Sequence, residues 1–327
     1  LEKRTPLQRR DELLAASDDS LRRVEIQRFA DRVTTRYRNR FDGPLVLVPC
    51  SARKPYGESQ SHAQFHRTIS YRAHKVSMTS PIGVVPQELE LTYPAQHYDS
   101  VVTGQWSETE IEFVANVLAR YLEHTDYPRH IAHVPPGGYT DIVERAADRA
   151  GVEFEFTVAD HPTTDESLAA LDGTLQGEEQ YLKREREHNT VRAIADYQFG
   201  DGETTGDDLF EHITTGGRYP SLRVNSEGEQ LATLVPQYGT LSFTLAGARR
   251  WQESAVPTKT VEIDGFVPQG SVLAPGILDA DPSIREGEEV VVEGPKAYAV
   301  GRATMHGDDM VRSTRGIAVD VRHVEER

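Results

Sequence analysis

Residues 49–62 gather the side chains of this sequence that are best suited to chemistry. They read Pro-Cys-Ser-Ala-Arg-Lys-Pro-Tyr-Gly-Glu-Ser-Gln-Ser-His. The segment combines the only cysteine of the chain with a lysine, a tyrosine, a serine and a histidine: Cys50, Lys54, Tyr56, Ser59 and His62. The thiolate is the nucleophilic form of cysteine, and neighbouring cations favour it. The pattern therefore favours a reactive thiolate at Cys50, supported by the nearby Lys54 and His62.

Each of these residues also has an ordinary structural interpretation. A lone cysteine near a buried strand is most often a small apolar core residue. Ser59 and His62 also fit a polar loop that bonds to its own backbone. The cations at Arg53 and Lys54 favour the reactive interpretation of Cys50, since they stabilise a thiolate.

An apolar run immediately before the segment must position it. Residues 44–49 are continuously apolar, which is typical of a buried strand. Open α/β sheets bind their ligands just past the carboxyl ends of such strands. Pro49 and Pro55 prevent a continuous helix, so we expect a rigid loop that carries Cys50.

The rest of residues 41–165 alternates strands with helices, and this predicts a three-layer α/β domain with a mainly parallel sheet. The predicted strands are 44–49, 75–79, 130–134 and 153–158. The predicted helices are 62–72, 107–124 and 138–150. The second of these begins with Ser107 and Glu110, the spacing of a capping box.

Three further regions complete the expected organisation. Residues 1–40 are predicted to form charged helices, with eleven Lys/Arg against seven Asp/Glu. Residues 166–257 are predicted to form a helical connector with a small α+β unit. In residues 258–327, short strands are separated by glycine and proline.

The order of the glycine-containing motifs in residues 258–327 resembles a PUA domain, a small β-barrel that binds structured RNA. The resemblance implies RNA contacts through basic side chains in or beside its strands, and we name Lys296, Arg302 and Arg315 as candidates. Cationic clusters supply most of the affinity for phosphates. The basic residues within 1–40 are the alternative contact surface.

Pro49, Cys50, Lys54, Pro55, Tyr56, Ser59 and His62 reproduce a seven-position pattern without a gap. This pattern resembles the signature of the archaeosine synthase alpha subunit. Proteins of that family modify a 7-cyano-7-deazaguanine base in the D-arm of archaeal tRNA. They add an amine, lysine in the better-understood cases, across its nitrile, and a radical enzyme partner then releases the archaeosine base. Members usually carry a transglycosylase-like domain upstream, which is missing from this chain.

The resemblance implies a transferase whose partners are tRNA and free lysine or another amine donor, with no cofactor. Cys50 would attack the nitrile carbon to give a thioimidate, or the amine would attack directly. His62 would act as acid and base, and Lys54 would lower the Cys50 pKa or hold the developing anion. Tyr56 would stack on the base and Ser59 would bond to it. Three further carboxylates are candidates for the cationic amine: Glu88, Glu90 and Asp99.

Composition adds several exclusions. One cysteine excludes an internal disulfide, which suits a cytoplasmic location. No apolar run approaches the roughly 20 residues that span a bilayer, so no membrane partner is expected. His62 and His66 are four residues apart but lack a third ligand, so no metal site is predicted. A homodimer is left open.

The net charge is −16, with only six lysines among 36 basic residues, and this acidic composition resembles the proteomes of halophilic archaea. Two other classes of function compete with the transferase. The first is a non-catalytic PUA-containing module that presents tRNA to another enzyme, and the intact seven-position pattern argues against it. The second is a cysteine hydrolase or amidase acting on a free small molecule, and a PUA-like domain argues against that.

Overall fold

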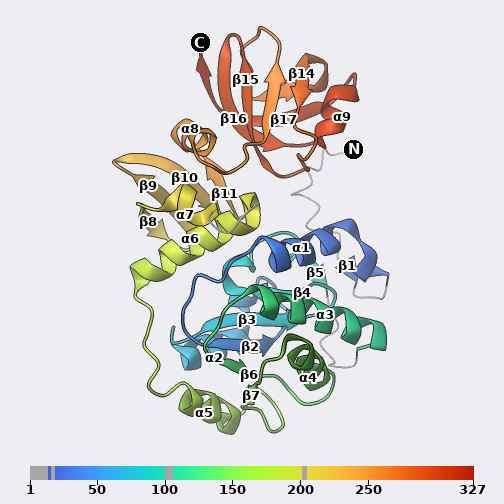
Figure 1. Ribbon diagram of the computed structural model, residues 1–327, viewed down its shortest axis with the longest axis vertical. Coiled ribbons are helices and arrows are strands. Elements are labelled where there is room, and N and C mark those ends of the chain that lie inside the picture. The colour runs from blue at the N-terminus through green and yellow to red at the C-terminus, as the bar shows by residue number, and fades with distance from the viewer. Residues whose placement is uncertain (1–13, 16–18, 100–105, 201–204) are drawn as a thin grey trace. The chain divides into compact units, whose positions relative to one another are not determined.

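The computed structural model describes residues 14–15, 19–99, 106–200 and 205–327, and it divides into two compact units (Figure 1). Unit 1 comprises residues 1–197 and 236–239, and unit 2 comprises residues 198–235 and 240–327. Each unit is described by itself.

A five-stranded sheet forms the centre of unit 1, in the order β4-β3-β2-β6-β7. Its strands are β2 (Leu45–Pro49), β3 (His74–Thr79), β4 (Gly83–Pro86), β6 (His130–Ala132) and β7 (Glu155–Phe156). β2 pairs in parallel with β3 and β6, and β6 pairs in parallel with β7. Only β4 is antiparallel. The expected mainly parallel sheet is confirmed. The strand expected at 153–158 is shorter, and β4 was not expected, because Gly83 and Pro86 favour a loop in the sequence.

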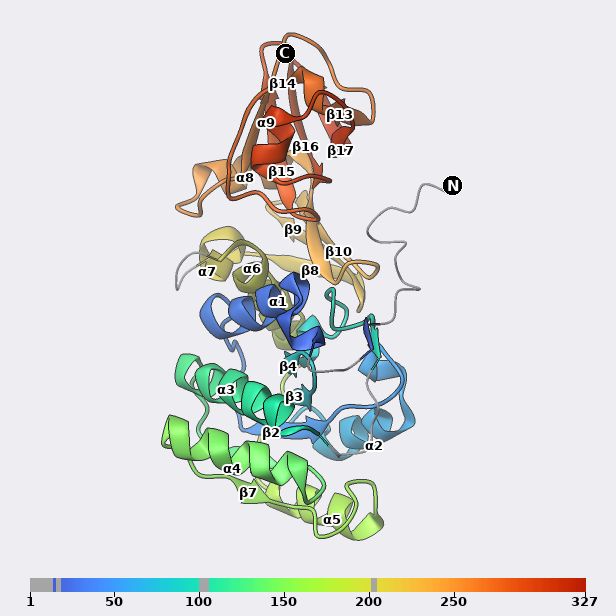
Figure 2. The same cartoon turned by 90° about the vertical axis from the view of Figure 1, so that its right-hand side faces the viewer.

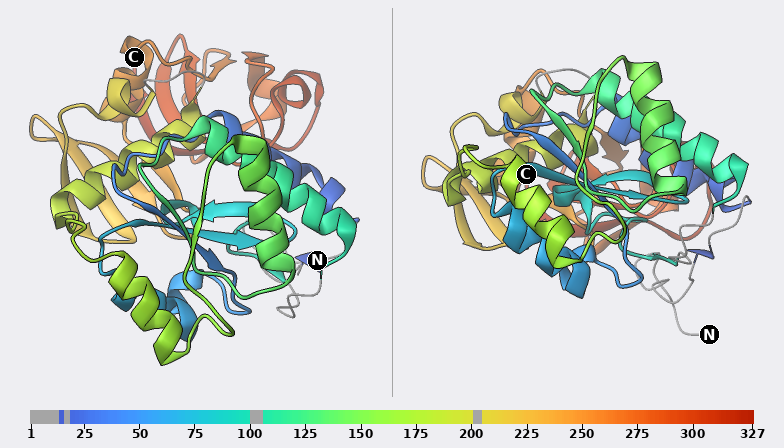
Figure 3. Two further views of the ribbon diagram at one scale, coloured as in Figure 1. Left: turned by 60° about the horizontal axis from the view of Figure 1, so that its bottom comes forward. Right: turned by 90° about the horizontal axis from the view of Figure 1, so that it is seen from below.

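Helices cover both faces of this sheet, so the expected three layers are present (Figures 2 and 3). On one face, α2 (Gln60–Ile69) and α5 (Asp165–Thr174) pack with apolar side chains of β2 and β6, including Val46, Val48 and Ile131. The other face carries α3 (Glu108–His124) and α4 (Gly138–Ala150). α1 (Val24–Thr35) packs against α3. Residues 1–40 were expected to form charged helices, and their described part contains one α-helix, α1.

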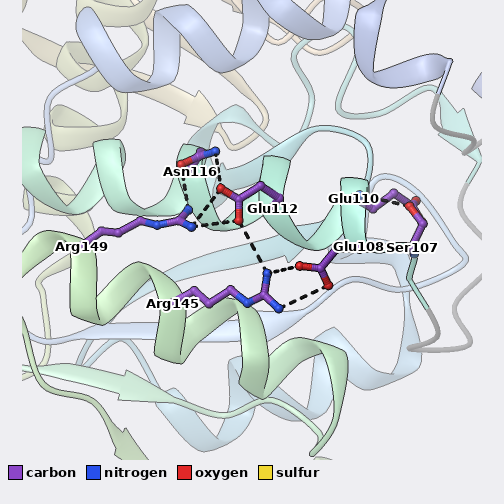
Figure 4. Close-up of polar contacts among 7 residues, drawn as sticks. All are labelled: Ser107, Glu108, Glu110, Glu112, Asn116, Arg145 and Arg149. Carbon is purple, nitrogen blue, oxygen red and sulfur yellow. Dashed lines mark hydrogen bonds and ion pairs between the residues drawn. The ribbon is translucent and has the colours of Figure 1, made fainter.

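The two helices α3 and α4 are joined by surface ion pairs (Figure 4). Ser107 caps α3 by accepting from the Glu110 backbone, and the Glu110 side chain accepts from the Ser107 backbone, which confirms the expected capping box. From α4, Arg145 reaches Glu108 at 2.5 Å, and Arg149 reaches Glu112 at 2.8 Å. The pairs link the two helices on the exposed side of the layer.

Several shorter elements and one long helix complete unit 1. The shorter elements are β1 (Leu14–Ala15), η2 (Ser20–Arg22), η3 (Tyr56–Glu58), η4 (Gln87–Leu89) and β5 (Tyr98–Asp99). The long helix is α6 (Lys183–Phe199), whose last two residues belong to unit 2. Near the end of α6, the buried Asp196 accepts from Arg40 through two hydrogen bonds of 2.7 and 2.9 Å. This bidentate pair ties the helix to the segment that leads into β2.

Unit 2 begins with an antiparallel sheet of four strands in chain order. Its elements are α7 (Thr205–Phe210), β8 (Thr214–Arg218), β9 (Ser221–Ser226), β10 (Glu229–Val235), β11 (Thr240–Phe243) and α8 (Leu245–Glu253). Glu227 and Gly228 both have positive φ, 51° and 88°, as a two-residue hairpin turn requires. Phe243 packs on Trp251 and Phe199 in the core of this part. The small α+β unit is confirmed.

The last segment folds into a six-stranded curled sheet in the order β13-β17-β16-β15-β12-β14. Its elements are β12 (Thr260–Ile263), β13 (Ser271–Leu273), η5 (Ala274–Gly276), β14 (Ile277–Ala280), β15 (Glu289–Gly294), β16 (Ala297–Ala303), α9 (Gly307–Arg312) and β17 (Ile317–Glu326). Val261, Val290, Ala299 and Val319 belong to its buried core. The arrangement confirms the expected PUA-type β-barrel. Within the described parts of both units, no helix combines the length and apolarity that a membrane crossing demands.

Candidate active site

Cys50 stands directly after β2, at the carboxyl edge of the parallel sheet. Its backbone N–H donates to the carbonyl of Met78 at 3.1 Å, which extends the β2–β3 pairing by one residue. The side chain is 6% exposed, and its Sγ lies 3.2 Å from the hydroxyl of Tyr139 at the start of α4. The thiol is thus covered but lies where α/β sheets place their sites.

Three tyrosine hydroxyls lie near this thiol, and one of them contacts it. Tyr139 contacts it, and Tyr56 from η3 hydrogen-bonds to Tyr98 from β5. Tyr98 in turn donates to Thr79 Oγ1 at 2.6 Å. Burial raises the pKa of all three phenols well above the usual value, and the charge of Cys50 contributes to each. The hydroxyls therefore stay protonated at ordinary pH. Tyr98 already donates to Thr79, so Tyr56 donates to Tyr98, and Tyr139 is the hydroxyl placed to donate to an anion at the sulfur.

Lys54 brings a cation to the same group. Its Nζ lies 4.0 Å from the centre of the Tyr98 ring, a cation–π contact. Tyr98 is the residue whose hydroxyl bonds to Tyr56, so the cation, the tyrosines and the thiol form one assembly. We call Cys50, Lys54, Tyr56, Tyr98 and Tyr139 the cysteine site.

His62 supports the cysteine site from α2. Its ring stacks on Tyr56 with the centroids 4.8 Å apart and the planes 11° from parallel. Nε2 lies 3.0 Å from the carbonyl of Pro49, the residue before Cys50, so Nε2 carries the hydrogen and donates. Nδ1 then accepts from Lys75 Nζ at 3.4 Å. Both ring nitrogens of His62 therefore have hydrogen-bond partners within the protein.

The environment of His62 also changes its titration. Burial, and then the charge of Lys75, lower its pKa from 6.5 to about 2. The buried ring therefore does not have the unperturbed pKa from which the acid and base role was predicted, and that role stays a prediction. In this geometry, His62 contacts the loop of Cys50 through Pro49 and also contacts Lys75.

The remaining predicted residues of unit 1 lie in different places. Ser59 is the N-cap of α2 and accepts from the His62 backbone N–H at 3.2 Å. Glu88 lies in η4 and is fully enclosed: Oε1 accepts from the Tyr37 hydroxyl at 2.7 Å, and Oε2 lies 3.0 Å from Nε2 of His74. Asp99 belongs to β5, and its side chain lies outside the described residues. Of these three, Ser59 adjoins the cysteine site through His62, and Glu88 belongs to a separate buried network.

Sequence reasoning missed several residues that the fold brings near Cys50 or His62. Tyr98 and Tyr139 come from segments 48 and 89 positions away along the chain, and no local pattern connects them to the cysteine. Lys75 was read only as the first residue of a strand. A lysine inside an apolar strand was the available signal, because a buried cation needs a partner.

The basic candidates of the C-terminal sheet do not form one strip. Lys296 precedes β16, whereas Arg302 lies near its other end, roughly 20 Å away at about 3.3 Å per residue. Arg302 is opposite Glu289 on β15. Arg315 is exposed just before β17, and the start of β17 pairs with the end of β16, so Arg302 and Arg315 lie at the same end of the sheet. Within the described residues, no group of three or more His, Cys, Asp or Glu side chains is arranged to hold a metal ion.

Three family models match the chain in succession. Residues 26–175 match a domain of unknown function, DUF5591. Residues 189–257 match the patch-forming domain C2 of tRNA-guanine transglycosylase. Residues 263–324 match the PUA domain. The site residues of unit 1 therefore lie in a domain whose family description gives no activity.

Two curated relatives cover the whole chain. The archaeosine synthase of Haloferax volcanii is 67% identical over 100% of this chain and 56% of its own length. The archaeosine synthase subunit alpha of Methanosarcina acetivorans is 43% identical over 100% of this chain and 54% of its own length. The chain thus spans about half the length of the curated relatives it matches. The halophilic organism of the first relative fits the acidic composition.

A solved structure shows the same fold. The crystal structure of AF0587, a protein of unknown function, superposes with a TM-score of 0.73 at 30% identity, covering 91% of this chain and 99% of that one. Identity along the entire chain to two archaeosine synthases, together with the transglycosylase C2 and PUA matches, agrees with the signature at residues 49–62. Over its whole length, the chain resembles the archaeosine synthase alpha subunits.

Proposed function

We propose that this chain is a tRNA-modifying transferase that adds an amine, lysine in the first instance, to the nitrile of 7-cyano-7-deazaguanine in tRNA. The observation that carries the proposal is the cysteine site. One thiol lies at the carboxyl edge of a parallel sheet, in contact with one protonated tyrosine hydroxyl and close to two more. The relatives named archaeosine synthase support the same reaction class.

The proposed reaction has two steps and needs no oxidant or reductant. First, Cys50 Sγ bonds to the nitrile carbon, and the thiol proton ends on the nitrile nitrogen, giving a neutral thioimidate. Second, an ammonium substrate loses a proton, and its nitrogen bonds to the same carbon. The carbon–sulfur bond breaks, and the products are an amidinium and the free thiol. Two protons of the ammonium are thereby passed on, one to the imine nitrogen and one to the departing sulfur.

Charge develops on two atoms along this path. The nitrile nitrogen becomes anionic when sulfur attacks, and the sulfur becomes anionic when it leaves. Tyr139 is within hydrogen-bond distance of the sulfur, so it stabilises the leaving thiolate. Lys54 holds positive charge over Tyr98, where it favours both anions. His62 contributes by position, since it fixes Pro49 and stacks on Tyr56.

In the proposal, unit 2 binds the tRNA and a radical enzyme acts later on the lysine adduct. The PUA and transglycosylase C2 matches support RNA binding. Residues 258–327 carry eight Lys/Arg against thirteen Asp/Glu, so the segment is acidic as a whole. The contact therefore depends on local basic residues such as Arg315, and on hydrogen bonds and shape.

The test uses the full chain, tRNA carrying 7-cyano-7-deazaguanine, and isotopically labelled lysine. Mass spectrometry of the digested nucleosides should show the base with the label attached. Cys50→Ala and Cys50→Ser should lower the rate by about three orders of magnitude or more, as removal of a nucleophile does, and both should keep the wild-type circular dichroism spectrum.

Three other results would favour a different mechanism or a different function. Near-normal turnover by Cys50→Ala would replace the thioimidate with direct attack by the amine. Absence of the labelled base with the wild-type chain would refute the transferase. Tight tRNA binding in that case would support the RNA-presenting module instead.

A further inference from the structure

Glu88 and Glu90 lie two residues apart after β4, and the structure gives them opposite surroundings. Both oxygens of Glu88 already have a partner, Tyr37 for one and His74 for the other, so neither is left without a hydrogen bond. In Glu90, Oε2 is buried without a hydrogen-bond partner. Among the residues that the structure describes, Glu90 is the only carboxylate with such an oxygen. A buried acceptor without a donor is costly, so this oxygen needs an explanation.

The other part of the Glu90 carboxylate is held by the loop that carries Cys50. The backbone N–H of Gly57 hydrogen-bonds to it. A Cβ at position 57 would lie 3.0 Å from Oε1, so glycine permits this close approach. Gly57 is exposed and stands directly after Tyr56 in the seven-position segment. The carboxylate is therefore oriented by the same loop as the cysteine site.

Electrostatics connect Glu90 to the cysteine site as well. The charges of Cys50 and Glu90 both act on the Tyr56 hydroxyl and raise its pKa. Both groups therefore lie within electrostatic range of Tyr56, and Glu90 approaches the backbone of the next residue, Gly57.

The positive charge of Lys75 offsets the cost of burying the Glu90 carboxylate, but Lys75 does not donate a hydrogen bond to Oε2. Its ammonium attracts Glu90 but is placed against Nδ1 of His62, at 3.4 Å. A hydrogen-bond donor is thus still missing at Oε2, and a cationic N–H donor is the best complement to a buried carboxylate oxygen. Primary ammonium groups provide such donors.

We propose that Glu90 binds the side-chain ammonium of the amine substrate through Oε2 and so places it for attack beside Cys50. This inference rests on the proposed function, because it names the residue that receives the second substrate. It predicts selection for an amine at the end of a flexible chain over the same chain without the amine.

Titration calorimetry of the full chain with L-lysine and L-norleucine tests this directly, without tRNA. The two ligands differ in the terminal ammonium and have chains of nearly equal length. Wild type should bind lysine at least about tenfold more tightly than norleucine, the size of one charge-assisted contact. Glu90→Gln should reduce this preference to about twofold or less. Glu58→Gln, an exposed carboxylate of the same loop that pairs with Arg53, should keep it.

A second variant guards against misfolding of Glu90→Gln. Gly57→Ala keeps the carboxylate but displaces Oε1, so it should weaken lysine binding and leave norleucine binding unchanged. An unchanged lysine preference in Glu90→Gln, or no preference in wild type, would overturn the inference. Failure of the proposed function looks different: lysine preference would persist in wild type, while labelled lysine would never reach the tRNA base.

Discussion

The cysteine site and the basic residues of the C-terminal sheet are built on different principles. Around Cys50, the fold collects groups from η3, α2, β3, β5 and α4 and buries them against one another. Around β16, the basic residues are exposed or half-buried and separated along the sheet. Chemistry at one carbon requires fixed geometry. Binding of a polyanion tolerates contacts that are spread over a surface.

This difference predicts how each region responds to substitution. Loss of one member of a buried, connected group leaves its partners without donors or acceptors, so the effects are large. Loss of one exposed arginine removes one phosphate contact and leaves the rest intact. The following predictions test that contrast in order of decreasing effect.

His62→Ala should have the largest effect on stability, because His62 joins three neighbours. The change removes the stack on Tyr56, the bond to the Pro49 carbonyl and the acceptor for Lys75. We expect the free energy of unfolding to fall by about 3–5 kcal/mol, because the change leaves both a cavity and a buried group without its hydrogen-bond partner. Urea unfolding measures it. A loss below about 1 kcal/mol would show that His62 is not a positioning residue.

The pH dependence of His62 separates positioning from proton transfer. The folded chain keeps this imidazole neutral down to a pKa of about 2, whereas the unfolded chain protonates it below about pH 6.5. The unfolded state therefore binds the extra proton, and wild-type stability should fall by up to about 1.4 kcal/mol per pH unit below pH 6.5. His62→Gln should flatten that slope. A rate inflection near pH 6.5 that disappears in His62→Gln would restore the acid–base role.

Glu88→Gln should cost about 3 kcal/mol, as breaking a buried, fully bonded carboxylate pair does. The pKa of Glu88 is lowered by the adjacent His74, although burial opposes this. Because the pKa of Glu88 is lower in the folded state, its ionised carboxylate stabilises the fold at pH values above the unfolded-state pKa, which is near 4.3. This stabilisation is lost as the pH falls through the folded-state pKa. The variant should therefore unfold with less acid dependence below about pH 4. Glu58→Gln is the matched control, and equal losses in the two variants would contradict the burial argument.

Arg315→Gln should weaken tRNA binding and reduce the salt slope by roughly one unit, as one lost phosphate contact does. Arg302→Gln should change the slope less, because Arg302 already faces the buried Glu289 across the strand pair. Lys296→Gln, at the opposite end of β16, tests whether RNA reaches that far. If the salt dependence of tRNA affinity is the same in all three variants and in wild type, the phosphate contacts must come instead from the basic residues within 1–40.

The sequence predicted the helices and strands better than it predicted the residues that surround Cys50. Segments with a clear period or cap were found nearly to the residue, as α3 after Ser107 and α4 at 138–150 show. β4 and α9 were missed, because glycine and proline hide the first and the second is only six residues long. The motif located Cys50, yet Tyr98 and Tyr139 come near it, and Lys75 reaches His62, only through tertiary packing. No single-sequence pattern records which distant strands meet at one edge.

The smallest expected effect lies on the outer surface of unit 1. Arg145 and Arg149 pair α4 with Glu108 and Glu112 of α3, but these groups are substantially exposed (Figure 4). Exposed pairs stabilise little because water screens them and ordering two long side chains costs entropy. The double variant Arg145→Met and Arg149→Met should lower Tm by less than about 3 °C in dilute buffer. The difference should vanish at 1 M salt, where the Debye length is only about 3 Å. A loss as large as that of His62→Ala, or one that persists at 1 M salt, would mean that this helix layer is held by its surface charges, and the contrast between buried and exposed groups would fail within unit 1 itself.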